Sequence, residues 1–214
     1  MARKNAGRAV GMRLVTFGFC LTMSVFAIVG LAAGQQAQEM KPKVSDKPFT
    51  AEQLAVYRAV LTSWYGGDIA AINLAFQTNP INPDDDSFDK ACLKGLILEK
   101  AKPAEVHRFR GEDPAHLGFA NLRLVDPELQ AKEVRENDPG NSIGEGKSVD
   151  DAVDRGFAHG LFTLGEIQFD QSHTHAIVSF SFWCGRLCGH GTTMLMEKKN
   201  GAWKRKSQCG GSVS

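Results

Sequence analysis

The chain has 214 residues, with 25 lysine and arginine side chains against 24 aspartate and glutamate side chains and a formal net charge of +1 at pH 7. Such a balance creates no strong positive field, which argues against nucleic acid as a partner. Hydrophobic residues make up 43% of the chain, and its length allows one domain with a sizeable core.

The N-terminal segment has the layout of a secretory signal peptide. An apolar run over residues 14–34 ends in the small residues that a signal peptidase requires. A basic region precedes this run and contains Arg3, Lys4, Arg8 and Arg13. We therefore expect residues 1–34 to be removed and the remaining protein to be periplasmic or extracellular. The alternative is an uncleaved membrane anchor over residues 14–34, because about 20 apolar residues can span a bilayer. The membrane is expected to be contacted only through this segment.

Cysteine content agrees with export. Cys20 lies in the leader, and the rest of the chain keeps Cys92, Cys184, Cys188 and Cys209. An even number of cysteines in an exported protein favours disulfides over free thiols, and four cysteines allow three complete pairings.

A polar segment over residues 35–48 predicts a flexible linker, and we expect a single domain over 49–214. Thr50 and Gln53 have the spacing of a capping box at the start of a helix. Apolar and aromatic residues then recur at steps of three and four, which predicts an amphipathic helix over 51–65.

The middle of the chain is less regular. It predicts a strand over 68–76, a short cysteine-containing helix over 88–97 and a strand over 119–125 that the following Asp-Pro pair ends. We expect a polar loop over 133–147 and a capped helix over 149–158.

Four strands are predicted in the C-terminal third, over residues 161–169, 174–183, 190–198 and 202–209. Asn200-Gly201 between the last two is a strong hairpin signal. The predicted fold is therefore α+β, with the N-terminal amphipathic helix packed on an antiparallel sheet that ends in a four-stranded meander.

Hairpin register predicts one apolar face of this sheet, which the helix would cover. The same register places Cys209 opposite Thr192 and gathers the cysteines at one end of the sheet. The residues expected on the apolar face are Ile167, Phe169, Ala176, Val178, Phe180, Phe182, Met194 and Met196.

The end of the sheet that holds Cys184, Cys188, His190 and Cys209 has three interpretations. Disulfides that clamp the sheet are favoured by the exported location. A Cys₃His ligand set would suit structural zinc, although the C-x₃-C-x-H spacing is not that of a common zinc knuckle. Thiol redox chemistry usually uses C-x-x-C at a helix N-terminus, and this spacing does not match it. No cofactor is expected.

Two glycine-rich patterns resemble catalytic motifs but lack their structural context. Residues 140–144 match G-x-S-x-G around Ser142, yet a polar stretch with a proline precedes them where a nucleophile elbow needs a strand. Residues 140–148 nearly match a phosphate-binding loop, but Asn141 replaces a required glycine. We predict no catalytic residue.

The C-terminal region resembles that of a group of exported bacterial proteins that have no agreed activity. These proteins share a strand ending in Phe-Asp, a strand with Ala and Val, then C-G-x-L-C-G-x-G, an apolar strand, Lys, a Gly turn and Trp. The resemblance implies a shared fold and no particular mechanism. It rests on Phe169, Asp170, Ala176, Val178, Cys184, Gly185, Leu187, Cys188, Gly189, Gly191, Lys198, Gly201 and Trp203.

These features favour an exported binding or structural module of the cell envelope, with its sheet clamped by disulfides. An envelope protein is the partner class that this location allows. The alternative is a small exported metal-binding or thiol-dependent enzyme that uses Cys184, Cys188, His190 and Cys209.

Overall fold

The computed structural model describes residues 42–65, 71–81, 89–100, 102 and 105–213. All of them belong to one compact unit, Glu39–Ser214. The expected signal peptide and most of the expected linker lie outside the described residues. In the described part of that linker, Lys43–Val44 forms strand β1, which pairs in parallel with β3, Glu105–Val106. No helix among the described residues is long and apolar enough to cross a membrane.

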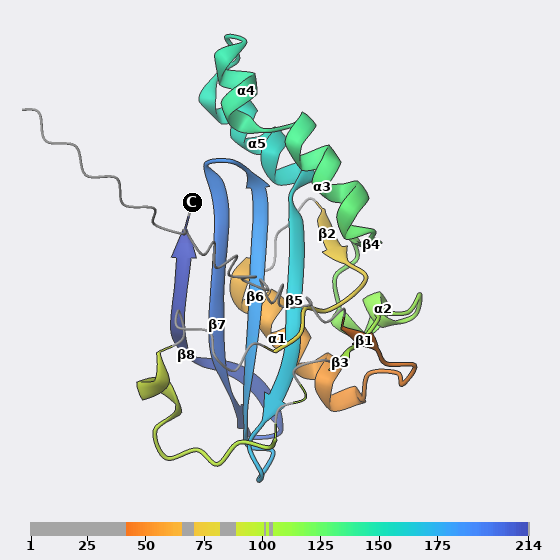
Figure 1. The fold of residues 1–214 in the computed structure, drawn as a ribbon, viewed down its shortest axis with the longest axis vertical. Coiled ribbons are helices and arrows are strands. Elements are labelled where there is room, and N and C mark those ends of the chain that lie inside the picture. Colours follow the sequence, from red (N-terminus) through yellow and green to blue (C-terminus); the bar gives the residue numbers. More distant parts are fainter. Residues whose placement is uncertain (1–41, 66–70, 82–88, 101, 103–104, 214) are drawn as a thin grey trace, which may run out of the picture. The chain divides into compact units, whose positions relative to one another are not determined.

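A six-stranded sheet organises the fold, with the strand order β4-β2-β5-β6-β7-β8 (Figure 1). The first three of these strands run parallel to one another, and β5 to β8 form an antiparallel meander. The expected α+β class and its antiparallel sheet are confirmed, and two short parallel strands extend the sheet beyond β5. The strands are β2 (Ile72–Ala75), β4 (Leu122–Val125), β5 (Leu161–Phe169), β6 (His175–Gly185), β7 (Cys188–Lys199) and β8 (Ala202–Val213).

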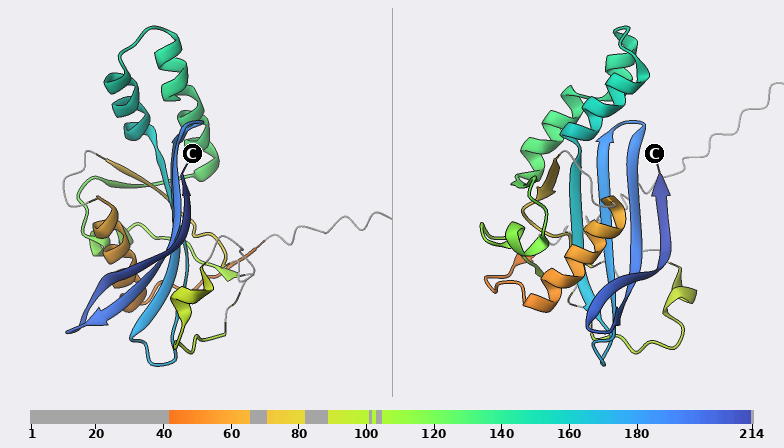
Figure 2. Two further views of the ribbon diagram at one scale, coloured as in Figure 1. Left: turned by 90° about the vertical axis from the view of Figure 1, so that its left-hand side faces the viewer. Right: turned by 180° about the vertical axis from the view of Figure 1, so that it is seen from behind.

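Helix α1 lies across one face of the sheet, and α4 and α5 lie beside the end at which β6 turns into β7 (Figure 2). Helix α1, the longest in the described part of the chain, covers the residues over which the sequence predicts an amphipathic helix. The helical elements are α1 (Ala51–Tyr65), the 3₁₀ helix η1 (Lys90–Leu93), α2 (Asp113–Leu117), α3 (Pro127–Glu136), α4 (Pro139–Gly144) and α5 (Val149–His159).

The main core lies between α1 and the sheet. Tyr57 and Leu61 of α1 are fully buried there, and Trp64 packs against the same core. Each large apolar side chain buried in this way contributes about 1.5–3 kcal/mol relative to an exposed one. The register argument for the apolar face is confirmed, because every residue expected on that face is in the core: Ile167, Phe169, Ala176, Val178, Phe180, Phe182, Met194 and Met196.

Two separate elements cover parts of the opposite face. Ile177 and Leu195 pack beneath the segment around η1, and Trp183 packs with Val134 of α3. These three sheet residues are apolar exceptions on a face that the sequence predicts to be polar. Their burial explains these exceptions, because each residue lies under the η1 segment or under α3. The strand pattern alone does not show that these elements pack there.

The prediction of a polar loop over residues 133–147 is wrong, because α3 ends within this range and α4 lies inside it. Both helices begin with an Asp-Pro pair. Asp126 accepts hydrogen bonds from the backbone N–H groups of the next helical turn, and Asp138 does the same for Gly140. Aspartate is a strong N-cap and proline suits the first helical position, so Asp-Pro starts a helix here and does not only end a strand.

The predicted position of Cys209 opposite Thr192 is also wrong. The β7–β8 hairpin begins in the expected register at Asn200-Gly201, where both residues have the positive φ of a tight hairpin turn. Register shifts along β8 then bring Gly211 opposite Thr192. A one-residue slip moves a side chain to the other face of the sheet, so Cys209 packs with Ile177 and not with the main core.

Candidate functional site

Two disulfides hold the sheet from its two faces. Cys92 pairs with Cys209 across a sequence separation of 117, with 5.6 Å between the Cα atoms. Cys184 pairs with Cys188 across a separation of 4, with 5.1 Å between the Cα atoms. The first bond ties the η1 segment to β8, and the second closes the turn between β6 and β7.

The proposed ligand set of Cys184, Cys188, His190 and Cys209 does not come together. Cys184 lies in the main core and Cys209 lies in the cluster on the opposite face. The ring of His190 stacks on Trp64 with 4.7 Å between centroids. Among the residues that the structure describes, no group of three or more histidine, cysteine, aspartate or glutamate side chains has the arrangement of a metal site.

The turn closed by the short disulfide packs against the start of α4. The carboxylate of Asp138 accepts a hydrogen bond of 2.7 Å from the backbone N–H of Arg186. Gly185 has a φ of +145°, and a Cβ there would lie 2.7 Å from Cδ of Pro139. Gly185 is therefore required at this turn by both its backbone angle and a close helix contact.

Asp170 organises the turn between β5 and β6. Its carboxylate accepts hydrogen bonds of 2.8 and 2.7 Å from the N–H groups of Thr174 and His175. Burial raises the pKa of Asp170, but these bonds and one from Ser172 outweigh it and lower the pKa to about 2. Phe-Asp at the end of β5 thus has a structural role.

The strongest candidate for a functional site is a buried pair formed by His107 and Glu166 of β5. Nδ1 of His107 lies 2.9 Å from Oε2 of Glu166, and their side chains are 14% and 9% exposed. The other carboxylate oxygen, Oε1, accepts hydrogen bonds from the N–H of His107, at 2.7 Å, and from the hydroxyl of Thr78. Both carboxylate oxygens of Glu166 therefore have hydrogen-bond partners.

Aromatic residues of the main core pack next to this pair. The ring of Phe49 lies 5.3 Å from that of His107 and packs edge-on against Tyr57. The Tyr57 hydroxyl donates to the carbonyl of Gly165 at 3.0 Å. Burial, assisted by the nearby charge of Glu166, raises the pKa of Tyr57 well above its usual range. Tyr57 is therefore a neutral donor that holds the adjoining backbone of β5.

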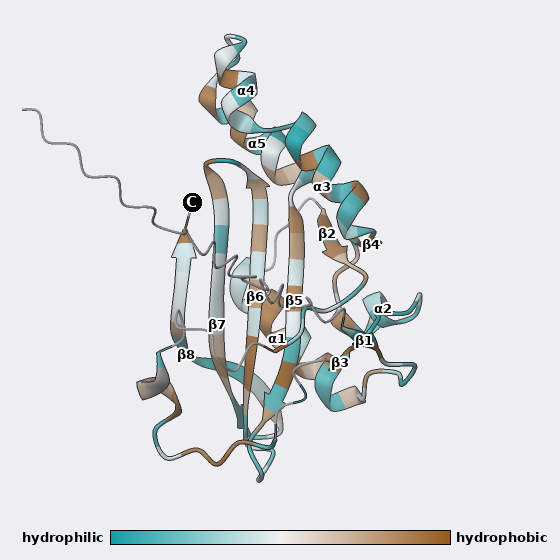
Figure 3. Ribbon diagram, in the orientation of Figure 1, coloured by the Kyte–Doolittle hydropathy of each residue, from teal (hydrophilic) through white to brown (hydrophobic). Residues whose placement is uncertain are grey.

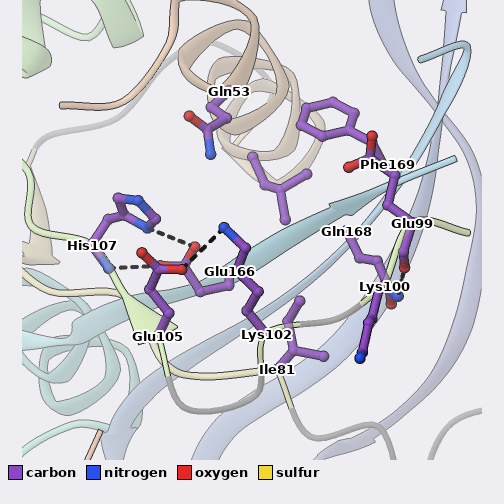
Figure 4. A pocket seen from close by; sticks show the side chains of 11 residues that line it. Gln53, Ile81, Glu99, Lys100, Lys102, Glu105, His107, Glu166, Gln168 and Phe169 are labelled. Carbon is purple, nitrogen blue, oxygen red and sulfur yellow. Dashed lines mark hydrogen bonds and ion pairs between the residues drawn. The ribbon is translucent and has the colours of Figure 1, made fainter. Parts of the chain in front are cut away.

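A cavity of about 160 Å³ lies beside the pair. Its lining includes Gln53 of α1, Lys100 and Gln168 together with His107 and Glu166, which Figure 4 shows arranged around the space. Every buried side-chain nitrogen and oxygen of the described residues has a hydrogen-bond partner. Because Nε2 of His107 has none in the described part of the chain, this atom must be accessible to solvent, and His107 lines the cavity.

Next to the cavity, His173 joins three elements. Its two ring nitrogens lie 2.9 Å from Glu52 of α1 and 3.1 Å from Glu99, and its ring stacks on Phe169 at 4.7 Å. Hydrogen bonds to Glu52 and then to Glu99 raise the pKa of His173 against the opposing effect of burial. The charged imidazolium matches two carboxylates at once, so this contact favours the protonated ring.

Sequence reasoning did not identify the buried pair. The β-strand pattern assigns Glu166 to the solvent face, and His107 has no motif around it. One signal was present: Glu166 is the sole charged residue within Leu161–Phe169. The partners could not be recognised, because they lie 59 positions apart in the chain. Ser142, by contrast, is a buried residue of the short helix α4, which does not follow a strand.

Comparisons with protein-family models, curated proteins and solved structures give no match to this chain.

Proposed function

We propose that the protein is an exported binding module that holds a small polar ligand in the cavity beside His107 and Glu166. The observation that supports this proposal is the different hydrogen bonding of the two ring nitrogens of His107. Glu166 fixes Nδ1, while Nε2 has no partner among the described residues and is open to solvent. The signal-like leader and the two disulfides support an oxidising location outside the cytosol.

The chemistry of the lining indicates the ligand class. In the tautomer that donates Nδ1–H to the Glu166 carboxylate, Nε2 accepts a hydrogen bond from a hydroxyl or amino group. The ammonium group of Lys100 has no ion-pair partner in the described residues and would attract an anion. A small carboxylate that carries a hydroxyl or amino group satisfies both groups.

Energetics also support a role in binding. A buried pair of hydrogen-bonded polar side chains is often no more stabilising than apolar residues of the same volume, because both groups lose their hydration. Stability alone therefore gives little reason for His107 and Glu166 to be buried together. A few polar side chains that converge on a concave pocket are typical of ligand-binding sites. The cysteine-based enzyme alternative has no comparable support, since all four sulfurs are bonded in pairs.

Titration calorimetry and the NMR signal of the His107 ring test this proposal with three probes. Glycolate and glycine carry the required donor and acetate lacks it. We expect glycolate or glycine to bind more tightly than acetate and to shift the Cε1–H signal of His107. The variants His107→Gln and Lys100→Gln should each weaken binding about tenfold, the loss of one hydrogen bond to a charged group.

The control is Lys47→Gln, which makes the same change as Lys100→Gln at an exposed lysine outside the cavity. It should bind like the wild type. Equal affinity for acetate and glycolate, or unchanged binding in both cavity variants, would contradict the proposal.

A further inference from the structure

Helix α5 carries a partly exposed apolar row, in which Phe157 has a ring contact with the sheet, 5.0 Å from Phe182 between centroids. Val149, Val153 and Phe157 are 59%, 37% and 48% exposed, and their spacing of four places them on one side of the helix. Asp150 and Asp154 form the adjacent row, and neither has a charged partner among the described residues. We call these five residues the acidic stripe. Figure 3 shows apolar and polar segments alternating along α5.

A groove of complementary character lies between α1 and the β7–β8 hairpin. It has a volume of about 460 Å³ and is lined mainly by apolar surface, with Trp203 and the small residues Ala55, Ala59 and Ala202. Arg58, Lys204 and Arg205 also line it, and none of the described residues that line it is acidic. We call it the basic groove.

Positive charge in the basic groove is not neutralised within the described part of the molecule. Arg205 lies opposite Met196 in the sheet register, which places it on the same face as α1. Neither Arg58 nor Arg205 has an ion pair with a described residue, and the Arg58 guanidinium lies against Gly118 of the α2 terminus. Lys204, which also lines the groove, has no ion pair with a described residue either, whereas Lys198 pairs with Glu52, and Lys199 and Lys206 pair with Glu197.

The acidic stripe and the basic groove lie at opposite ends of the sheet. Helix α5 leads directly into Leu161, which pairs with Trp183 near the β6–β7 turn. The groove lies at the other end of β7, at the β7–β8 turn. The 12 residues of β7 separate the two turns, a span of roughly 35–40 Å at about 3.3 Å per residue. The stripe therefore cannot reach the groove of its own molecule.

We propose that the acidic stripe of one copy docks into the basic groove of a second copy. The apolar row of a convex helix fills a concave apolar groove, which is a common mode of helix recognition. The aspartate row then faces the unpaired arginines, so both unmatched charges find partners. Such a contact is heterologous and joins copies head to tail into chains or rings. It involves residues distinct from the cavity beside His107 and does not depend on ligand binding there.

Analytical ultracentrifugation of the protein isolated from the exported fraction tests this proposal. At low salt the wild type should form assemblies that grow with concentration, and high salt should weaken them because the rim charges are exposed. Val153→Lys in the stripe and Arg205→Glu in the groove should each weaken association at least about 30-fold, as expected for central contacts of an interface.

Mixing the two variants gives the decisive result. Val153→Lys keeps an intact groove and Arg205→Glu keeps an intact stripe, so an equimolar mixture should form dimers and nothing larger. Leu129→Lys on α3 and Lys47→Glu are matched controls at exposed positions and should assemble like the wild type. Circular dichroism shows whether each variant is folded. A wild type that stays monomeric at millimolar concentration, or a mixture without dimers, overturns the proposal.

Discussion

The two disulfides are expected to differ in their contribution to stability because they close loops of very different length. In the chain-entropy model, a cross-link across a separation of 117 restricts the unfolded chain by about 5 kcal/mol, and one across a separation of 4 by about 2 kcal/mol. Cys92→Ala/Cys209→Ala should therefore destabilise the protein by roughly 3 kcal/mol more than Cys184→Ala/Cys188→Ala. The local packing loss is similar in the two pairs, because each contains one buried and one half-buried cysteine.

Urea unfolding of both double variants and the wild type measures these differences. Thermal unfolding gives a second measure, because a domain of this size loses about 2–4 °C of melting temperature per kcal/mol. The melting temperature should fall by roughly 10–20 °C in Cys92→Ala/Cys209→Ala and by roughly 4–8 °C in Cys184→Ala/Cys188→Ala. A greater loss for Cys184→Ala/Cys188→Ala would refute the loop-length argument. If that variant were as stable as the wild type, the short disulfide would not clamp the sheet at all.

Three further predictions follow from individual side chains. Because the folded pKa of His173 is raised, its stabilising contribution is present in full below the unfolded pKa of about 6.5 and is lost as pH rises through the folded pKa. The variant His173→Asn is suitable for comparison, because asparagine tolerates the positive φ at this position. Its difference from the wild type in unfolding free energy should shrink as the pH rises from about 5.5 to about 8.5. A constant difference would exclude the ion-pair explanation. Gly160→Ala should cost about 1–3 kcal/mol in urea unfolding, because its Cβ would lie 2.4 Å from the Phe182 ring. Gly144→Ala, with nothing within 4 Å of the new Cβ, is its control and should not destabilise; equal losses would argue against the close contact. Glu166→Gln should cost about 1–3 kcal/mol, since an amide NH₂ group replaces one of the two carboxylate oxygens that accept hydrogen bonds here; unchanged stability would show that these hydrogen bonds do not stabilise the fold.

The parts of the fold that depend on local pattern could be predicted from the sequence. Alternation along β5, β6 and β7 indicated which side chains face the core, because a strand has a side-chain period of two. The turns predicted Phe169 opposite Thr174 and Phe180 opposite Met194. The observed β6–β7 pairing is shifted by two residues over most of its length, which leaves the faces unchanged. The β5–β6 pairing is shifted by two residues over Ile167–Phe169 and by one over Leu161–Leu164, because a bulge lies between Leu164 and Ile167. Likewise, the Asn200-Gly201 turn has the backbone that its sequence indicated.

The sequence predictions were wrong in two kinds of place: where a one-residue shift in strand pairing changes the face of a side chain, and where one motif can either end or begin an element. A single bulge in β8 is enough to move Cys209 to the opposite face, and no local pattern in β8 marks its position. The Asp-Pro pairs that start α3 and α4 resembled strand and loop breakers. Proline can end one element and begin the next, and only the hydrogen bonds of Asp126 and Asp138 distinguish the two.

The sequence by itself determined the apolar face of the sheet, the helix that covers it and the presence of cysteines in pairable number, because each depends on residues close together in the chain. The tertiary structure decided which cysteines pair, and it placed His107 beside Glu166 and the acidic stripe far from the basic groove. These are contacts between distant segments, set by strand register and by the packing of helices on the sheet. Such contacts require the whole chain to fold, so no short stretch of sequence encodes them.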